Sequence, residues 1–373
     1  MNETPDELKT ALVLPGGGAR GAFQVGVLKA LAELLPRASS NPFPIVSGTS
    51  AGAVNAVVLA TRARKYRSAV AELERVWGHF RCNQVYKTDH LTMLKSSLHW
   101  LAALVLGGWL VGMPRSLLDN SPLRRLLSRN VHFPRIRNAI EAGHLDAVAI
   151  TAAGYASARS ISFFEAHPGH AGWERTRRMG QAAELSLEHL MASIAVPYVF
   201  PPARIGNEWF GDGAMRQATP LSPAVRLGAD RILVIGIRDE MGGAEPDNAA
   251  EPPSFAQIAG YMLDTLFMDG LYSDLERLMR INDLVDATPA DPPHIGGSKM
   301  PLAAARRSKP GPDIRYLASD RFVQRLADDP TAPQGLLQAI DELIKGRKTP
   351  EQRQSPRQAR NHPFRLLHGL HSV

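Results

Sequence analysis

The stretch from Phe43 to Arg62 constrains the fold of this chain more than any other. A short apolar run, Phe43–Val46, leads into Gly48-Thr49-Ser50-Ala51-Gly52, and a helix-like stretch follows as far as about Arg62. A G-x-S-x-G sequence between a strand and a helix is typical of the sharp turn that exposes a serine hydroxyl above the edge of a sheet. The two glycines permit the tight bend and the close approach of neighbouring segments. We therefore expect Ser50 to be a nucleophile on a strand-to-helix turn.

A second glycine-rich box, Gly16-Gly17-Gly18-Ala19-Arg20-Gly21, lies nearer the N-terminus. It follows a strand-like run, Thr10–Leu14, and precedes a helix-like stretch from Ala22 to Leu35. Free backbone N–H groups in such a loop can hold the negative charge that develops on a carbonyl oxygen under nucleophilic attack. Together the two boxes indicate a serine hydrolase.

Further apolar runs alternate with helical stretches along the chain, and strand-like ones cover 145–153, 160–165 and 231–237. Near-continuous apolar strands separated by helices are typical of a sheet that is covered on both faces. We expect an α/β fold, a three-layer sandwich around a central, mostly parallel sheet. Ligands of such sheets bind beyond the carboxyl ends of the strands, so both glycine boxes can face one site.

The formal net charge of +7 favours anionic partners. No basic stretch interleaves with aromatic residues as in nucleic-acid modules, so we expect contact with an anionic membrane surface and no nucleic acid. Cys82 is the only cysteine, which excludes an intrachain disulfide. Residues 1–9 are polar and lack the apolar core of a secretory signal, so the expected location is the cytoplasm or the membrane periphery.

One segment, 98–113, is strongly apolar and lies in a stretch without charged residues between Lys95 and Arg115. Its length approaches the roughly 20 residues of a membrane-spanning helix, but the Gly107-Gly108 pair and Pro114 disfavour a span. Two interpretations stay open. The segment is either a buried helix or an interfacial cover over the site, with its tryptophans as membrane anchors.

The predicted domain organisation has three parts. Residues 9–290 form the α/β domain, and they end in a long helix predicted from apolar residues spaced between Phe255 and Met279. Residues 291–345 form a C-terminal extension whose last helix covers about 333–345. Residues 346–373 are basic, which predicts a disordered tail or an electrostatic tether to anionic lipid.

Ser50 needs a base. None of the 12 histidines lies in a recognisable motif, so the sequence offers no convincing histidine for this role. The segment Gly211-Asp212-Gly213-Ala214 instead places a carboxylate between two glycines, after a strand-like run from Arg204 to Phe210. An isolated Asp-Gly turn is the simpler explanation of this segment. A second observation is needed to choose between them.

That observation is the combination of motifs. The set Gly-Gly-Gly-Ala-Arg-Gly, Gly-Thr-Ser-Ala-Gly and Asp-Gly-Ala, in this order, resembles the patatin-like phospholipases, which use a Ser–Asp dyad without histidine. The segments Ala192–Pro202 and Thr219–Leu221 resemble the family's sequence before and after its aspartate. The resemblance covers about residues 9–238 and implies a patatin-like fold. It also implies a lipid acyl hydrolase that acts on phospholipids or lysophospholipids through an acyl-enzyme.

The resemblance implies a role for each matching residue. Ser50 is the nucleophile and Asp212 is its base, while the oxyanion hole is formed at Gly16, Gly17 and Gly18, through the amides of the latter two and that of Ala51. The supporting residues are Arg20, Gly48, Ala51, Gly52 and Gly213. Arg20 fixes the glycine loop or meets an anionic head group, unless it is a plain surface cation. We expect neither cofactor nor metal, because no acidic calcium-binding loop of the EF-hand type is found.

Three other functions fit parts of this sequence. A dinucleotide-binding loop matches Gly16, Gly18 and Gly21, but it requires an acidic residue about 20 positions further on, and the second strand ends at Gly48 without one. Two alternatives stay open. One is a non-catalytic lipid-binding or regulatory protein of the same fold, and the other is a carboxylesterase or thioesterase for non-lipid substrates.

Overall fold

A computed structural model describes residues 8–87, 98, 116–217, 220–236, parts of 252–281, and the backbone of 313–317. Its strands are β1 Thr10–Leu14, β2 Ile45–Thr49, β3 Ala147–Gly154, β4 Ser160–Ala166, β5 Trp173–Arg175, β6 Arg178–Ala182, β7 Ala203–Ile205, β8 Glu208–Asp212, β9 Arg231–Ile235 and β10 Asp313–Leu317. Its α-helices are α1 Gly21–Leu34, α2 Ala51–Thr61, α3 Tyr66–Gly78, α4 Cys82–Val85, α6 Ser121–Asn130, α7 Pro134–Glu141, α8 Leu187–Ser193 and α9 Ser222–Arg226. Two short 3-10 helices, η1 Gly18–Arg20 and η2 Gly213–Met215, follow β1 and β8.

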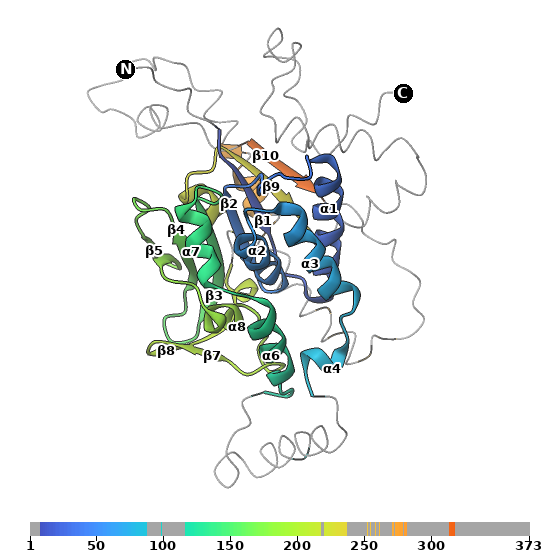
Figure 1. The fold of residues 1–373 in the computed structure, drawn as a ribbon. Coiled ribbons are helices and arrows are strands. Elements are labelled where there is room, and N and C mark those ends of the chain that lie inside the picture. The colour runs from blue at the N-terminus through green and yellow to red at the C-terminus, as the bar shows by residue number, and fades with distance from the viewer. Residues whose placement is uncertain are drawn as a thin grey trace, which may run out of the picture.

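The described strands form one mixed sheet in the order β10-β9-β1-β2-β3-β4-β6-β5, with β8 and β7 attached to β3 (Figure 1). The five strands from β10 to β3 are mutually parallel. Their register aligns Leu14 with Gly48 and Thr49 with Thr151, so β1 and β2 end side by side while β3 continues to Gly154. The expected α/β architecture with a mostly parallel central sheet is confirmed.

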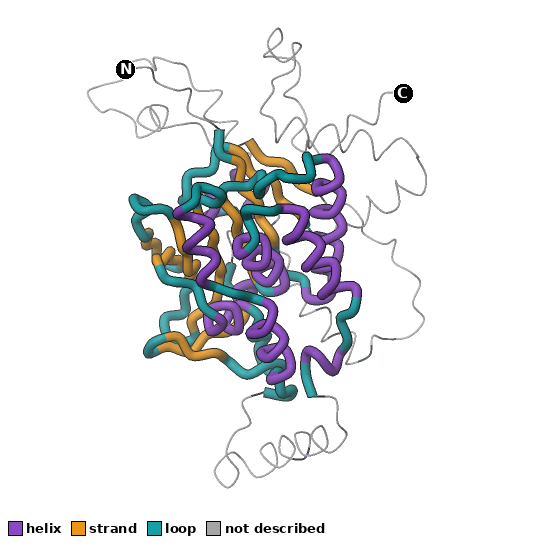
Figure 2. Tube along the Cα trace, in the orientation of Figure 1, coloured by secondary structure: helices purple, strands orange, loops and turns teal. Residues whose placement is uncertain are grey.

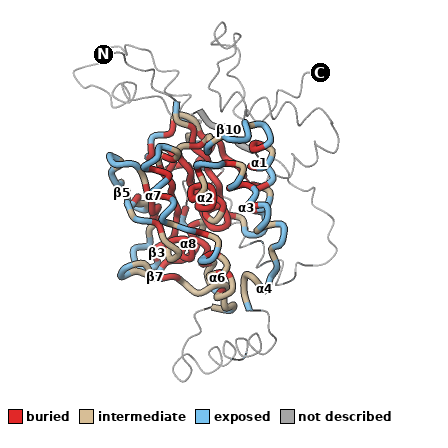
Figure 3. The backbone as a smooth tube through the Cα atoms, in the orientation of Figure 1, coloured by how far each residue is buried: buried red, intermediate tan, exposed pale blue. Residues whose placement is uncertain are grey.

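The two faces of the sheet are buried against different sets of helices. Leu12 and Leu14 of β1 belong to a large apolar cluster with α1, α2 and α3, whereas Ala11 and Val13 belong to a second cluster with α9. Side chains of a strand alternate between its faces, so consecutive residues of β1, from Ala11 to Leu14, must be apolar for the strand to lie between two layers. Figure 2 shows α1, α2 and α3 in front of the strands, and Figure 3 shows that buried residues concentrate along the sheet and α2.

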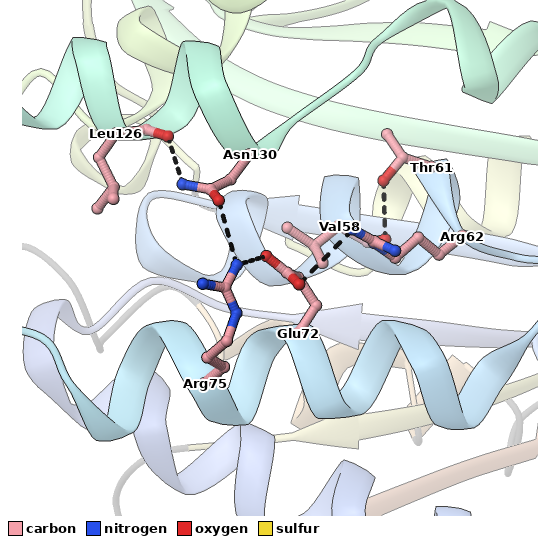
Figure 4. Close-up of polar contacts among 7 residues, drawn as sticks. All are labelled: Val58, Thr61, Arg62, Glu72, Arg75, Leu126 and Asn130. Carbon is pink, nitrogen blue, oxygen red and sulfur yellow. Dashed lines mark hydrogen bonds and ion pairs between the residues drawn. The ribbon is translucent and has the colours of Figure 1, made fainter.

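Polar contacts connect α3 with the end of α2 and with α6 at the outer surface of the helical layer (Figure 4). Glu72 of α3 forms ion pairs with Arg75 and, at 3.6 Å, with Arg62 at the end of α2. The Arg75 guanidinium also donates to the Asn130 side-chain oxygen of α6 at 3.3 Å. Because these side chains are partly exposed, each pair adds at most about 1 kcal/mol, and the apolar clusters dominate the stability of this layer.

The predicted strands and helices of the first 235 residues agree with the structure within a few residues, with one correction. The run Arg204–Phe210, expected as one strand, is the hairpin of β7 and β8. Ile205 pairs with Glu208, and Gly206 between them has φ of 57°. Glycine at the first position of a two-residue turn is a hairpin signal, and it outweighs the strand propensity of its neighbours.

The structure also adds a strand in the C-terminal third. β10 lies within the predicted extension of 291–345 and pairs with β9 in parallel. Leu271 and Leu275, from the predicted helix of 255–279, are buried against the second apolar cluster. Apart from Leu98, the segment 98–113 lies outside the described residues, as do the predicted helix 333–345 and the basic tail 346–373. In the described part of the chain, no helix has the length and apolar character to cross a membrane.

Candidate active site

Ser50 occupies the turn between β2 and α2 with φ of 54° and ψ of −127°. A positive φ is unfavourable for a residue with a side chain and costs about 1–3 kcal/mol, so the surrounding contacts must impose it. The side chain is only 5% exposed. Ser50 therefore lies in a sharp turn between a strand and a helix, where the sequence places it.

The glycines around Ser50 are required by close backbone contacts. A Cβ atom on Gly52 would lie 2.0 Å from the Leu14 carbonyl oxygen, and one on Gly48 would lie 2.4 Å from the Gly52 carbonyl oxygen. Neither site can accept alanine without a shift of the backbone. These contacts press the start of α2 against the end of β1, and the turn at Ser50 results from that packing.

The glycine loop after β1 lies directly beside Ser50. A Cβ on Gly16 would be 2.9 Å from the Ser50 Cβ and 3.6 Å from the Ala214 Cβ, so the loop approaches both halves of the expected site. Gly18 begins η1 with φ of 57°, and Arg20 at its end is exposed. Within the described part of the chain, the Gly17 and Gly18 amides donate no hydrogen bond that competes with a ligand. Ala51 follows Ser50 at the first turn of α2, where backbone amides are free.

Asp212 ends β8, pairs with Ala152 of β3, and is fully buried. Its amide donates to the Ala195 carbonyl at 2.8 Å, and its Oδ1 accepts the Ala214 amide at 2.9 Å. A Cβ on Gly213 would lie 2.1 Å from the Thr151 carbonyl oxygen, so only glycine lets the chain turn here. The Asp-Gly-Ala segment is thus a fixed turn at the end of β8, and its position is set by β3.

Burial raises the pKa of Asp212 from 3.8 to about 7, although the Ser50 hydroxyl and the Ala214 amide both lower it. Its Oδ2 is buried and has no partner at normal hydrogen-bond distance in the described part of the chain. The carboxyl of Asp212 thus keeps one oxygen without a partner in the described residues, and it lies close enough to the Ser50 hydroxyl for that group to lower its pKa. A base is most effective when its pKa lies near the working pH, and this carboxyl meets that condition.

A comparison with known protein families agrees with this geometry. The model of the family described as patatin-like phospholipase matches residues 12–225, which is more than half of the chain and includes Ser50 and Asp212. This chain belongs to the patatin-like phospholipase family. The resemblance seen in the sequence motifs is thereby confirmed.

Among relatives of this patatin-like chain, a cGAMP-activated phospholipase of Pseudomonas aeruginosa is 28% identical over 204 residues. The match covers 55% of this chain and 52% of that protein, so the chain spans about half the length of this curated relative. Two solved structures are similar at 15% identity. VipD from Legionella pneumophila has a TM-score of 0.38, with 84% of this chain and 61% of that one covered. The ExoU–SpcU complex of Pseudomonas aeruginosa has a TM-score of 0.30, with 75% and 57% covered.

The structure of this patatin-like domain also reveals polar residues that the sequence did not identify. The Ser193 hydroxyl at the end of α8 accepts the Ser50 amide at 2.9 Å and donates to the Thr151 carbonyl at 2.7 Å. Gln217 bonds the Thr49 hydroxyl with its side-chain oxygen and donates to the Thr151 hydroxyl at 3.1 Å. Ser193 lies in the segment that resembles the family's sequence before its aspartate, whereas nothing in the sequence pointed to Gln217.

Other groups lie away from this site. Among the described histidines, none hydrogen bonds to Ser50 or Asp212, and His189 accepts the Ser186 amide at the start of α8 instead. In the described ranges, no group of three or more histidine, cysteine or acidic residues could bind a metal ion. A cavity of about 330 Å³ lies elsewhere, between α9 and the helical residues after Leu271. Its lining includes Arg178, Arg226, Asp274 and Arg277.

Proposed function

We propose that this chain is a lipid acyl hydrolase in which Ser50 and Asp212 form the catalytic dyad. The observation that carries the proposal is the buried Oδ2 of Asp212, which has no partner in the described residues and belongs to a carboxyl with a pKa of about 7. Membership of the patatin-like phospholipase family supports an ester of a lipid as the substrate. Phospholipids and lysophospholipids are the proposed substrate class.

The chemistry follows from the two side chains. The Ser50 hydroxyl attacks the ester carbonyl carbon while its proton passes to the Asp212 carboxylate. The amides of Gly17, Gly18 and Ala51 stabilise the oxyanion, and each such donor typically contributes about 10²–10³-fold in rate. Asp212 then returns the proton to the departing alcohol, which leaves an acyl ester on Ser50. Water attacks this ester in the same way, with Asp212 as the base again.

The first test is fatty-acid release from a panel of phospholipid and lysophospholipid vesicles, with wild type, Ser50→Ala and Asp212→Asn compared. Release by wild type that both variants lose supports the dyad. Loss in Ser50→Ala alone contradicts the role of Asp212 and requires another base. Because one relative is named a cGAMP-activated phospholipase, each reaction is run with and without cGAMP. A wild type that is silent on every lipid under both conditions contradicts the proposal. It favours instead a non-lipid ester as substrate or a lipid-binding role.

We further propose that the protein acts from the cytoplasm at the surface of anionic membranes. The net charge of +7 supports this, as do Leu117 and Tyr198, which are 50% and 76% exposed. These two residues lie together, because the Leu117 amide donates to the Tyr198 carbonyl at 2.6 Å. Sedimentation with phosphatidylglycerol and phosphatidylcholine vesicles tests the contact. Equal binding to both kinds of vesicle contradicts an electrostatic contribution, and subcellular fractionation tests the location.

A further inference from the structure

Ser193 connects three segments at the centre of the site. Its hydroxyl accepts one hydrogen bond, from the Ser50 amide at 2.9 Å, and donates one, to the Thr151 carbonyl at 2.7 Å. The residue is fully buried. A hydroxyl has a single proton, so this donation to Thr151 leaves only lone pairs facing Ser50. The Ser193 hydroxyl is therefore the acceptor of the bond that the Ser50 amide donates.

The bond constrains the unfavourable backbone of Ser50. With φ of 54°, this residue keeps its conformation only while its neighbours impose it. The Ser193 hydroxyl fixes the peptide unit that enters Ser50, and the packed glycines fix the unit that leaves it. The same bond occupies the Ser50 amide, which is therefore unavailable to a substrate oxyanion. The donors beside Ser50 are then those of the glycine loop and Ala51.

The segment that carries Ser193 also holds the other half of the site. Two residues further on, the Ala195 carbonyl accepts the Asp212 amide at 2.8 Å. Thr151, which accepts from Ser193, precedes the residue that pairs with Asp212 in the sheet. One three-residue stretch, 193–195, thus binds the backbone amides of both Ser50 and Asp212.

We propose that Ser193 is a positioning residue that keeps the Ser50 hydroxyl aligned with the Asp212 carboxylate. The inference rests on the proposed function of the dyad. Reaction at a serine depends steeply on geometry, and a displacement of about 1 Å can cost on the order of 10²-fold in rate. Removal of the hydroxyl leaves substrate contacts intact, so kcat falls and KM changes little.

The test compares wild type with Ser193→Ala, Ser193→Cys and the matched control Ser162→Ala. Ser162 is also a buried sheet-side hydroxyl, 6% exposed, and it bonds the Thr151 hydroxyl at 3.0 Å without touching Ser50. The readouts are the rate at which a fluorophosphonate labels Ser50, kcat and KM for lipid hydrolysis, and hydrogen exchange in the peptide that contains Ser50. All are measured well below the lowest melting temperature of the set.

We expect Ser193→Ala to slow labelling and kcat by about 10²-fold, with KM within about threefold of wild type and faster exchange at Ser50. Ser193→Cys retains a weaker donor and acceptor of similar size, so its rates fall between those of wild type and Ser193→Ala. Ser162→Ala stays near wild type. Labelling of Ser193→Ala at the wild-type rate overturns the inference, and so does an equal loss in Ser162→Ala. A wild type that neither hydrolyses lipid nor reacts with the probe contradicts the proposed function itself, which separates the two failures.

Discussion

Among the described residues, two aspartates, Asp212 and Asp274, are buried, and burial raises the pKa of both. The pKa of Asp212 rises from 3.8 to about 7, and that of Asp274 rises to about 6. Asp212 is fully buried and Asp274 is 8% exposed. Both also accept a hydrogen bond from a backbone amide, Ala214 for the first and Leu221 for the second. Burial and a backbone amide therefore do not distinguish a catalytic carboxyl from a structural one.

The difference lies in the remaining neighbours. Arg178 and Arg277 lower the pKa of Asp274, so its carboxylate is balanced by positive charge. In the described part of the chain, no cation contributes to the pKa of Asp212, and the side chain that lowers this pKa is that of Ser50, through its hydroxyl. Asp212 is thus a carboxyl near a hydroxyl, with one oxygen unpaired in the described residues, and this difference supports its proposed role as the base. Asp274 is a carboxyl that joins α9 to the helix after Leu271.

The largest expected effect is the loss of hydrolysis on neutralising one aspartate and not the other. General base catalysis typically contributes 10²–10⁴-fold, so we expect Asp212→Asn to lower kcat by about 10³-fold or more. Asp274→Asn retains an oxygen for the Leu221 amide and should stay within about threefold of wild type. Initial rates on the best lipid of the panel measure both. A comparable loss in the two variants would remove the distinction between the aspartates.

The next effect is the pH dependence of hydrolysis. Asp212 accepts a proton only when it is ionised, so kcat/KM should rise with pH through an apparent pKa near 7 and then level off. Asp274 ionises near pH 6, and Asp274→Asn should leave the midpoint near 7 unchanged. Rates between pH 5 and 9 on an uncharged ester test this without titration of the substrate. A midpoint near 4 for wild type would mean that Asp212 is not held in a desolvated site.

Part of the fold could be predicted from the sequence. The strands β1, β2, β3, β4 and β9 are predictable because each is a short apolar run bounded by turn residues. The hairpin at Gly206 was missed because the whole of 204–210 is strand-like and the turn within it depends on one glycine. β10 was missed because its pairing with β9 bridges a long stretch of chain, and no local pattern records such a contact.

The same limit applies to the site. The sequence predicts Ser50 from its G-x-S-x-G turn and Asp212 from the family resemblance, and the turns themselves require the glycines beside them. Ser193 contacts the Ser50 amide and Gln217 contacts the Thr49 hydroxyl, and both also bond Thr151 of β3, so these contacts form only in the folded chain. The raised pKa of Asp212 also arises from burial by the whole fold. A sequence shows which side chains are present at a turn, but the electrostatic environment appears only after folding.

A smaller effect concerns stability. A carboxyl whose folded pKa lies above its unfolded value stabilises the protein least when it is ionised, so stability is lost as pH rises from about 4 to the folded pKa. Asp212→Asn removes this loss, so at pH 8.5 its free energy of unfolding should exceed that of wild type by an amount on the order of 4 kcal/mol, from the shift to about 7, and it should melt at a higher temperature. Near pH 4 the two should melt together. Asp274→Asn should show the same sign and a smaller gain, complete by about pH 6.

Thermal unfolding across pH 4–8.5 measures all three proteins. A wild type that becomes more stable than Asp212→Asn as pH rises would mean that the carboxylate is compensated in the folded state. That outcome would make Asp212 resemble a paired, structural carboxylate, and it would weaken the case that this residue is the base.

The smallest effect tests whether the arginines explain why the pKa of Asp274, about 6, lies below that of Asp212, about 7. Arg277 is exposed and lowers the pKa of Asp274 through its charge, which solvent screens. Arg277→Gln should therefore raise the pKa of Asp274 by a fraction of a unit and leave that of Asp212 unchanged. Carbon-detected NMR titration of the aspartate carboxyls follows both groups in one sample, with Asp212→Asn and Asp274→Asn to assign the signals.

A matched control, Arg204→Gln, removes an exposed arginine that makes no ion pair in the described residues and bonds the Gly206 carbonyl. If both arginine variants shift Asp274 equally, its pKa responds to overall charge and not to the cation beside it. If Arg277→Gln alone acts, local cations separate the structural aspartate from the one whose partner is the Ser50 hydroxyl.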